Sequence, residues 1–467
     1  MKQARWIIGY TLSALLAVAL AGTFGIIRSA SFTMALLPEA LAAAVVPGPV
    51  PSYDSAKPTV AVLLGNTPTE ATDFLVPYAM FVESGAYNVY AVAESRAVRT
   101  LAGGVDVVPQ VSFAELEAQL HGSPDIIVVP AMLKVGSPDN VPVLDWLRQH
   151  DHGQTLVFSW CAGAEVLAAS GLIDGKTATT HWGKIDAFER TYPAVTWQRG
   201  ERYVDSGMLL TTGGITAGVD ATLHLLARRN GQAVADRVAQ AMHYPGSPYV
   251  TNPRMPHYTT DLADTIVLAH NAFNWPRRQT GVWLYDGVGE VDLAAVVEAY
   301  QVSATNQIHT VATAPALVSQ HGLQLVPRRQ AHNLLSMDRV LIPGGDGAKQ
   351  AADHLPRGLG GAGREVTLLQ NDQTPTYAFT LALQDLAATH NVLTARVAAK
   401  YLEVRSPLRL VGPRWPLHLL VIPVLAGLGG CIALWSLLWL SHRVLGLHRG
   451  NRRRPSAPSA QPWIGSI

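Results

Sequence analysis

The stretch TLVFSWCAGAEVLAASGL, residues 155–172, decides how this chain folds. Its apolar first part predicts a strand ending at Trp160, and the small residues from Ala162 onward predict a helix that stops near Gly171. Cys161 then lies on the sharp turn between them. A sulfur at the start of a helix lies near its positive dipole end and free N–H groups, which favour the thiolate. We therefore expect the pKa of Cys161 to lie below that of a free thiol.

The residues after this cysteine are small. Ala162, Gly163 and Ala164 would let the helix pack closely on the sheet and leave the sulfur accessible, as in a nucleophile elbow. The alternative is a buried structural cysteine, which is the common fate of a lone Cys. Both interpretations stay open on position alone. Glu165, the next residue, fits an ordinary helical or packing position.

Outward from this turn, apolar strands alternate with helical patterns. Runs rich in Val and Ile occur at residues 59–64, 88–93, 125–131, 155–160 and 208–215. Helical patterns occur at residues 72–84, 113–120, 141–150, 217–229 and 232–243. This alternation is typical of βαβ units. The sequence therefore predicts an α/β fold with a mostly parallel sheet covered on both faces.

A second, weaker cycle follows a connector at 246–279 that carries one predicted helix at 261–273. The segment GVWLYDGVGEVDLAAVVEAY (281–300) echoes TVAVLLGNTPTEATDFLVPYAMF (59–81), with Asp292 in the place of Asp73. DRVLIPGGD (338–346) likewise echoes DIIVVPAML (125–133). No cysteine occurs in this part. We predict that residues 280–410 are a degenerate second copy without a nucleophile, repeated mainly in its first half.

Two long apolar segments flank these units. Residues 6–27 and 417–440 carry no formal charge, and each is about as long as a helix that crosses a hydrocarbon core of roughly 30 Å. The first segment fits a cleaved signal peptide or an anchor, and we favour the anchor because no small-residue cleavage site directly follows it. The sequence thus predicts transmembrane helices at 1–28 and 416–441, with an Ala/Pro-rich linker at 29–57 that acts as a semi-rigid tether.

Charge predicts the orientation in the membrane. Five Arg residues between 443 and 454 follow the second span, and Lys2 and Arg5 precede the first, so both termini are expected in the cytoplasm. The tail at 442–467 would be cytoplasmic and the units between the spans extracytoplasmic. Arg405, Arg409 and Arg414 oppose this orientation.

Composition limits the class of partner. Lys and Arg total 35 and Asp and Glu total 34, so there is no basic excess typical of a nucleic-acid-binding protein. The two cysteines, Cys161 and Cys431, cannot pair because the second lies in an apolar span. We expect a small-molecule substrate or ligand, a membrane partner and a homodimer or internal pseudo-dimer, with no nucleic acid, cofactor or metal.

Two longer segments carry a resemblance to a known family. FSWCAGAEVLAASGLIDGKTATTHW (158–182) resembles the cysteine elbow of the ThiJ/PfpI family, closest to the branch with isocyanide hydratase and the ligand domains of AraC-type regulators. GGITAGVDATLHLLARRNGQAVADRVAQAMHYP (213–245) resembles the end of the same domain. The resemblance covers residues 58–245. It implies the flavodoxin-like sandwich of the class I glutamine amidotransferases.

The resemblance also implies site residues. Cys161 matches the family nucleophile, Asp73 the acid that hydrogen-bonds it, and His181 a histidine found near it. Backbone amides at Ala131 and Ala162 would hold an oxyanion. The alternatives to these catalytic roles are that Asp73 caps its helix and that His181 is a structural hydrogen-bonding residue.

Departures from the family pattern narrow the range of activities that we expect. Pro130-Ala131-Met132 stands where many members have Pro-Gly-Gly, Ala162 stands where the protease-like members have His, and no late His-x-Glu follows. These features disfavour peptidase and amidotransferase activity, and no helix-turn-helix domain follows to support a transcription factor. Three hypotheses remain: a cysteine-dependent hydratase or hydrolase of small electrophiles, a thiol-redox or ligand sensor, and a structural pseudo-dimer.

Overall fold

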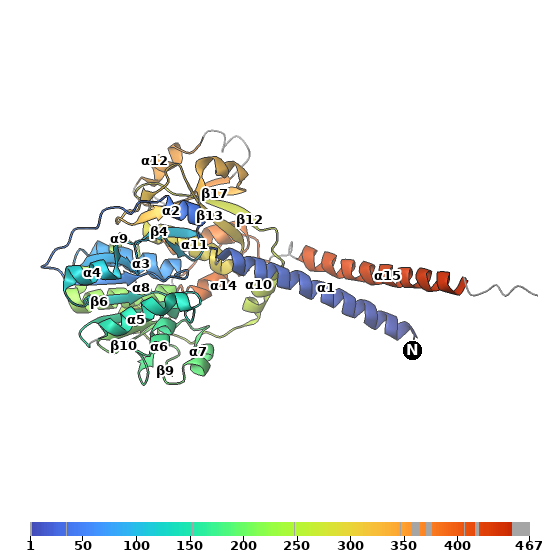
Figure 1. Ribbon diagram of the computed structural model, residues 1–467, viewed down its shortest axis with the longest axis horizontal. Coiled ribbons are helices and arrows are strands. Elements are labelled where there is room, and N and C mark those ends of the chain that lie inside the picture. Colours follow the sequence, from blue (N-terminus) through green and yellow to red (C-terminus); the bar gives the residue numbers. More distant parts are fainter. Residues whose placement is uncertain are drawn as a thin grey trace, which may run out of the picture.

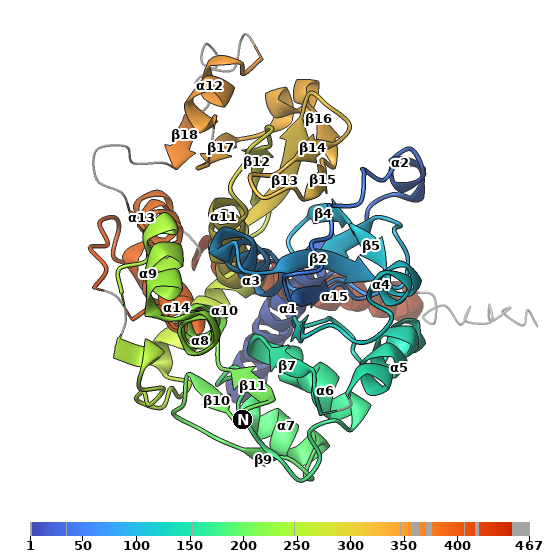
Figure 2. The same cartoon turned by 90° about the vertical axis from the view of Figure 1, so that its left-hand side faces the viewer.

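The described residues build two large, mostly parallel sheets with helices packed between them (Figures 1 and 2). The computed structural model describes residues 2–33, 35–151, 153–246, 248–345, 347–356, 365–369, 376–405, 407–415 and 420–450. The predicted α/β class with a mostly parallel sheet is confirmed. Parts of the predicted second span (416–419) and of the basic tail (451–467) lie outside the described residues.

The first sheet has seven strands in the order β10-β11-β7-β6-β1-β2-β5. Only the β10–β11 pair is antiparallel. Its strands are β1 (Thr59–Leu63), β2 (Asn88–Ala93), β5 (Val111–Ser112), β6 (Ile126–Val129), β7 (Leu156–Ser159), β10 (Tyr203–Asp205) and β11 (Leu209–Thr212). The central strands are buried along their whole length, as expected where helices cover both faces.

Two helical layers cover this sheet. One consists of α4 (Phe113–Leu120), α5 (Val141–His150), α6 (Ala164–Ser170) and α7 (Ile185–Thr191). The other consists of α3 (Ala71–Ser84), α8 (Ile215–Asn230) and α9 (Gln232–Ala241). The long predicted helices and strands are confirmed to within two residues at most ends, because their apolar periodicity coincides with the buried faces.

The second sheet has five parallel strands in the order β16-β13-β12-β17-β18. The strands are β12 (Arg278–Trp283), β13 (Asn306–Ala312), β16 (Arg329–Gln330), β17 (Arg339–Pro343) and β18 (Glu365–Leu369). Taken from β18, this order repeats β7-β6-β1-β2-β5 of the first sheet, each strand with its counterpart in chain order. Its helices are α11 (Glu290–Ser303), α12 (Ala348–Asp353), α13 (Ala378–Thr389) and α14 (Val392–Tyr401).

A four-stranded antiparallel sheet of two hairpins joins the two units. β3 (Arg99–Leu101) and β4 (Val105–Val108) form one hairpin, and β14 (Leu317–Val318) and β15 (Gln324–Val326) form the other. β4 and β15 pair antiparallel across the joint, with Leu325 opposite Val107. An antiparallel pairing of equivalent strands is the geometry of a two-fold interface. These short strands were not predicted from the sequence.

Helices α3 and α11 pack against each other at the centre of the molecule (Figure 2). A single hydrophobic core runs across this contact and includes Phe74 and Met80 of α3 and Val296 and Tyr300 of α11. Beside it, His321 of the second unit donates hydrogen bonds to Glu290 (2.7 Å) and to Glu83 of α3 (3.2 Å). The two units therefore bury one continuous interface.

The segment between the first apolar helix and β1 lies against the folded units. Gln324 accepts a hydrogen bond from the Gly48 amide (2.7 Å) and donates one to Val46 O (3.0 Å). The side chain of Asn88 accepts a hydrogen bond from the Asp54 amide and donates one to the Asp54 carbonyl. The expected tether is therefore wrong for this stretch, because its backbone groups find partners on both units and its apolar Leu37 packs against the β4–β15 joint.

Two long helices, α1 (Lys2–Thr33) and α15 (Val421–Gly450), extend side by side away from the folded units (Figure 1). Gln3–Arg28 and Val421–Ser441 are long and apolar enough to cross a membrane, and only 6% of each apolar window is buried. They pack through small residues: Ser13 Oγ donates to Gly430 O at 2.8 Å, a close approach that a side chain at position 430 would prevent. α10 (Leu262–Phe273) in the connector packs on the inner end of α1.

Candidate functional site at Cys161

Cys161 lies two residues after the end of β7 and begins a short 3₁₀ turn, Cys161–Gly163, ahead of α6. Its φ of +50° is strained for a residue with a side chain, a feature concentrated at functional sites. Its backbone is fixed on both sides: the amide donates to Thr212 Oγ1 (3.0 Å), and the carbonyl accepts from Thr180 Oγ1 (3.0 Å). The predicted elbow is thus formed at the carboxyl ends of β7 and β11.

Gly163 lets the elbow approach the sheet. A Cβ at this position would lie 2.1 Å from Val129 O, far inside contact distance. The amide of Trp160 also donates to the same carbonyl oxygen, at 3.0 Å. The turn is therefore held against the end of β6 with no room for a larger residue, which is the packing that the small residues predicted.

Asp73 is the third residue of α3 and is fully buried. The N-cap of this helix is Glu70, whose side chain accepts from Ala71 N, so the interpretation of Asp73 as the cap is wrong. Instead, Asp73 Oδ2 accepts a hydrogen bond from the Ala131 amide at 3.1 Å. Its other oxygen is buried and has no hydrogen-bond partner among the described residues. Asp73 is therefore a carboxyl group with one atom free for the site.

The same contact removes an expected oxyanion donor. The Ala131 amide is occupied by Asp73 in this structure, so only the Ala162 amide, which points at the Cys161 sulfur, remains of the predicted pair. Met132 fills the space beside it and lies against Gly65. An oxyanion at Ala131 would have to displace the carboxylate.

Burial dominates the electrostatics of both groups. It raises the pKa of the Cys161 thiol well above the usual value, and the charge of Asp73 raises it further, against the lowering effect of the Ala162 amide. Burial and the charge of Glu70 also raise the pKa of Asp73. The expected low thiol pKa is therefore wrong for this conformation: α6 has only seven residues, and Cys161 exposes 9% of its surface. Both groups favour their protonated forms.

Both ring nitrogens of His181 are already hydrogen-bonded, so neither is free to interact with the Cys161 sulfur. Its Nε2 donates to Tyr401 O (2.9 Å), and its Nδ1 accepts from Gly183 N (3.2 Å). Burial lowers its pKa to about 4. The structural interpretation of His181 therefore fits the geometry, because a neutral ring with both nitrogens bonded has no capacity left to act as a base.

The second unit contributes two carboxyl groups that were not predicted from the sequence. Glu298 of α11 is buried and accepts a hydrogen bond from Thr72 Oγ1 (3.2 Å), and burial and Glu70 raise its pKa well above the usual value. Glu403 follows α14 and lies over Gly213 and Gly214. Glu298 could have been found from the sequence, because it is a lone acid inside the apolar run of α11. Glu403 could not, because no local sequence pattern shows that its segment packs against the first unit.

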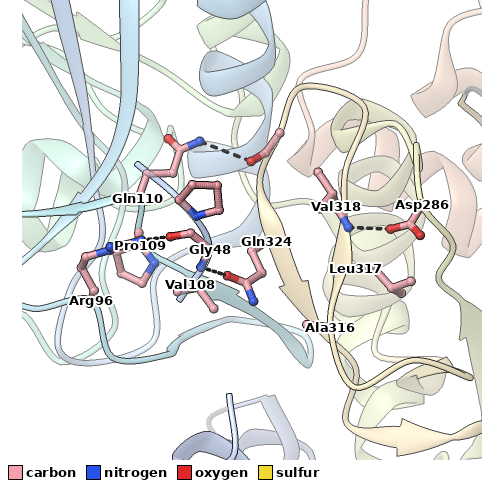
Figure 3. Close-up of a pocket in the computed structure, with 12 residues that line it drawn as sticks. Gly48, Arg96, Val108, Pro109, Gln110, Asp286, Ala316, Leu317, Val318 and Gln324 are labelled. Atoms are coloured by element: carbon pink, nitrogen blue, oxygen red, sulfur yellow. Dashed lines mark hydrogen bonds between the residues drawn. The ribbon is translucent and has the colours of Figure 1, made fainter. Parts of the chain in front are cut away.

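Among the described residues, three cavities lie outside the Cys161 site. The one in Figure 3, of about 300 Å³, lies where the linker crosses the joint between the units, with Gly48, Gln110 and Gln324 in its wall. Gln110 there donates to Gly322 O (3.3 Å). A second, of about 420 Å³, lies between Tyr249 and Tyr377, and a third, of about 160 Å³, beside Leu172. Cys161 lines none of the three.

A family model matches the first unit, and several known proteins are similar to part of this chain. The model of the DJ-1/PfpI family matches residues 58–228. Isonitrile hydratase of Pseudomonas putida is 32% identical over 177 residues, which cover 38% of this chain and 74% of that protein. The HTH-type transcriptional regulator CdhR of Pseudomonas aeruginosa is 36% identical over 98 residues, which cover 21% of this chain and 29% of that protein. DJ-1beta of Drosophila melanogaster is 21% identical, with a TM-score of 0.35 over 40% of this chain and 98% of that chain.

Proposed function

The chain belongs to the DJ-1/PfpI family, and on that basis we propose that it is a membrane-anchored, cysteine-dependent enzyme that hydrates or hydrolyses a small electrophile. The observation that carries the proposal is the strained Cys161 at the carboxyl end of the sheet, with the buried Asp73 carboxyl acting on it. The isonitrile hydratase relative supports hydration as the reaction class.

The protonation state suggests the order of steps. Cys161 Sγ forms a bond to the electrophilic carbon, and the atom that gains the electron pair takes a proton from Asp73. The thiol proton passes to Asp73 and restores its protonated form, so no unpaired ion is left in the buried site. In a hydration, water then adds to the carbon, one water proton passes to the substrate atom beside the carbon and the other to the sulfur, and cleavage of the S–C bond restores the thiol. In the hydrolysis of an amide, the amine leaves with the proton from Asp73 before water adds. The Ala162 amide lies where negative charge develops beside the sulfur.

Turnover of a panel of small isonitriles, aldehydes and amides by the full chain tests this function. We expect Cys161→Ala to abolish turnover and Asp73→Asn to lower it by about 100-fold or more. Cys431→Ala, which removes the other thiol, is the matched control and should keep full activity. Full turnover in Cys161→Ala would disprove the proposal.

A second candidate is a thiol-redox or ligand sensor. It is favoured by the closed, protonated Cys161 and by the similarity of part of this chain to transcriptional regulators. Peroxide treatment followed by mass spectrometry separates the two functions. Stoichiometric oxidation of Cys161 in a chain without turnover supports the sensor, whereas turnover that depends on Cys161 supports the enzyme.

We further infer the context of the site. α1 and α15 would anchor the protein in a membrane with both termini on the cytoplasmic side and the two sheets outside, since both helices run away from the folded units together. Residues 280–410 would be a degenerate copy that serves as a built-in dimer partner, as their repeated strand order favours. Labelling of single cysteines placed at position 3 and at position 190 with a membrane-impermeant reagent tests the orientation.

A further inference from the structure

Glu403 is a buried carboxyl group that forms no ion pair with a cationic side chain among the described residues. Its side chain is fully buried, and no side chain among the described residues hydrogen-bonds its carboxylate. Its φ is +54°, the left-handed region that residues with side chains avoid. Burial of a carboxyl group and strain of the backbone both cost free energy. A residue held in this way at a strained position indicates function more than packing.

The backbone of the first unit makes room for this side chain. A Cβ on Gly214 would lie 2.8 Å from Glu403 Cγ and Cδ, and one on Gly213 would lie 2.9 Å from an oxygen of the carboxylate. These glycines directly follow Thr212, the residue that accepts the Cys161 amide hydrogen bond. The carboxylate of Glu403 therefore lies over the carboxyl end of β11, next to the strand that carries the cysteine.

The segment that carries Glu403 is fixed to the first unit at three successive carbonyl groups. Tyr401 O accepts from His181, Leu402 O from Thr216 N (3.1 Å), and Glu403 O from Thr216 Oγ1 (2.6 Å) and Arg202 (3.1 Å). These contacts give His181 a role as an anchor of this segment. They also place Glu403 independently of its own side chain.

The charge of Glu403 affects the pKa of Cys161, and the surroundings of Glu403 shift its own pKa. It contributes to the raised pKa of Cys161, after burial, Asp73 and Glu70. Burial raises the pKa of Glu403 to about 7, against the lowering effects of Arg202 and the Gly214 amide. A carboxyl group that titrates near neutral pH can give and take a proton with little cost, unlike an exposed Glu.

We propose that Glu403, supplied by the end of the second unit after α14, is a second acid–base residue of the Cys161 site. The inference rests on the proposed function. In the hydrolytic step, its carboxylate takes a proton from water as the water oxygen bonds to the carbon held by Cys161. The proton returns to the sulfur as the S–C bond breaks. The site is then incomplete without the second unit, which explains why a copy lacking a nucleophile remains attached.

The test uses Glu403→Gln in the full chain and two readouts that should move in opposite directions. Loss of the negative charge should lower the pH midpoint of Cys161 modification by methyl methanethiosulfonate by about 0.5 to 1 unit, a roughly three- to tenfold faster reaction below the midpoint. Loss of the base should lower turnover by about 100-fold or more. A residue that only supports the fold would not make the thiol more reactive while it abolishes turnover.

Asp292→Asn is the matched control, since it also removes a buried carboxyl group whose pKa burial raises to about 7, but on helix α11 of the second unit. It should change neither readout. Gly214→Ala is the second variant in case Glu403→Gln fails to fold: the added Cβ displaces the carboxylate and should shift the midpoint in the same direction.

The outcomes separate the two proposals. An unchanged midpoint in both variants overturns the role of Glu403 whether or not turnover exists, as does turnover within about threefold of the wild type in Glu403→Gln. A Cys161 that stays unmodified throughout the pH range of the folded protein also overturns it. Turnover that survives Cys161→Ala defeats the proposed function, while the midpoint shift still decides whether Glu403 is coupled to the thiol.

Discussion

Gly163→Ala should damage the elbow far more than its size suggests. The added Cβ would lie 2.1 Å from Val129 O, whereas such contacts are not found below 3.0 Å, so the turn must move by at least 0.9 Å (3.0 − 2.1). The neighbouring atoms are backbone atoms of Val129 and Pro130, which cannot rotate away. Overpacking of this kind costs about 1–3 kcal/mol, and we expect the upper part of that range. A shift of about 1 Å at a reacting group also costs roughly 100-fold in rate.

Urea unfolding of the full chain in detergent gives the change in stability, and modification of Cys161 at fixed pH reports the position of the sulfur. Gly136→Ala is the matched control, because a Cβ there meets nothing within 4 Å and its φ is not positive. Gly136→Ala should keep wild-type stability and thiol reactivity. A Gly163→Ala protein as stable and as reactive as the control would refute the close packing of the elbow on β6.

Three further predictions concern the joint between the units and its buried charges. Burial alone would lower the pKa of His321, but its hydrogen bonds to two carboxylates raise it, so its contribution is present at low pH and lost as pH rises through the folded-state value. His321→Gln should therefore cost about 2 kcal/mol at pH 6 and clearly less at pH 9, and an equal cost at both, by chemical unfolding, would exclude a protonated His321. Arg202→Met should cost about 3–5 kcal/mol because Asp220, at 2.5 Å, loses its cation, and a loss below about 1 kcal/mol would contradict that pairing. Residues 57–250 expressed alone should dimerise or aggregate through the uncovered face of α3, whereas a soluble monomer by light scattering would count against an internal partner.

The sequence predicted the first unit well because its signals are local. Strand and helix periodicity, the small residues around Cys161 and the terminal apolar runs each lie within about 20 contiguous residues. They fixed the α/β class, the elbow and the two long apolar helices. The echo of Asp73 at Asp292 also predicted a second cycle, and both acids occupy the third position of corresponding helices.

The state of the site required tertiary structure. The predicted low pKa of Cys161 followed from its place before a helix, but burial and the neighbouring carboxyl groups outweigh a seven-residue helix. The use of the Ala131 amide by Asp73 depends on how α3 packs against the end of β6. Solvation and the pairing of polar groups are properties of the folded interior, so no local pattern could reveal them.

The sequence by itself determined that a strand, a cysteine turn and a helix form, since these depend on apolar spacing and on residue size. Only the tertiary structure decided what surrounds the sulfur. Glu298 and Glu403 come from more than 130 residues further along the chain (298 − 161 = 137), and they reach the site because two sheets that share a five-strand order pack about α3 and α11. The physical reason is that burial couples charges through space, whatever their separation along the chain.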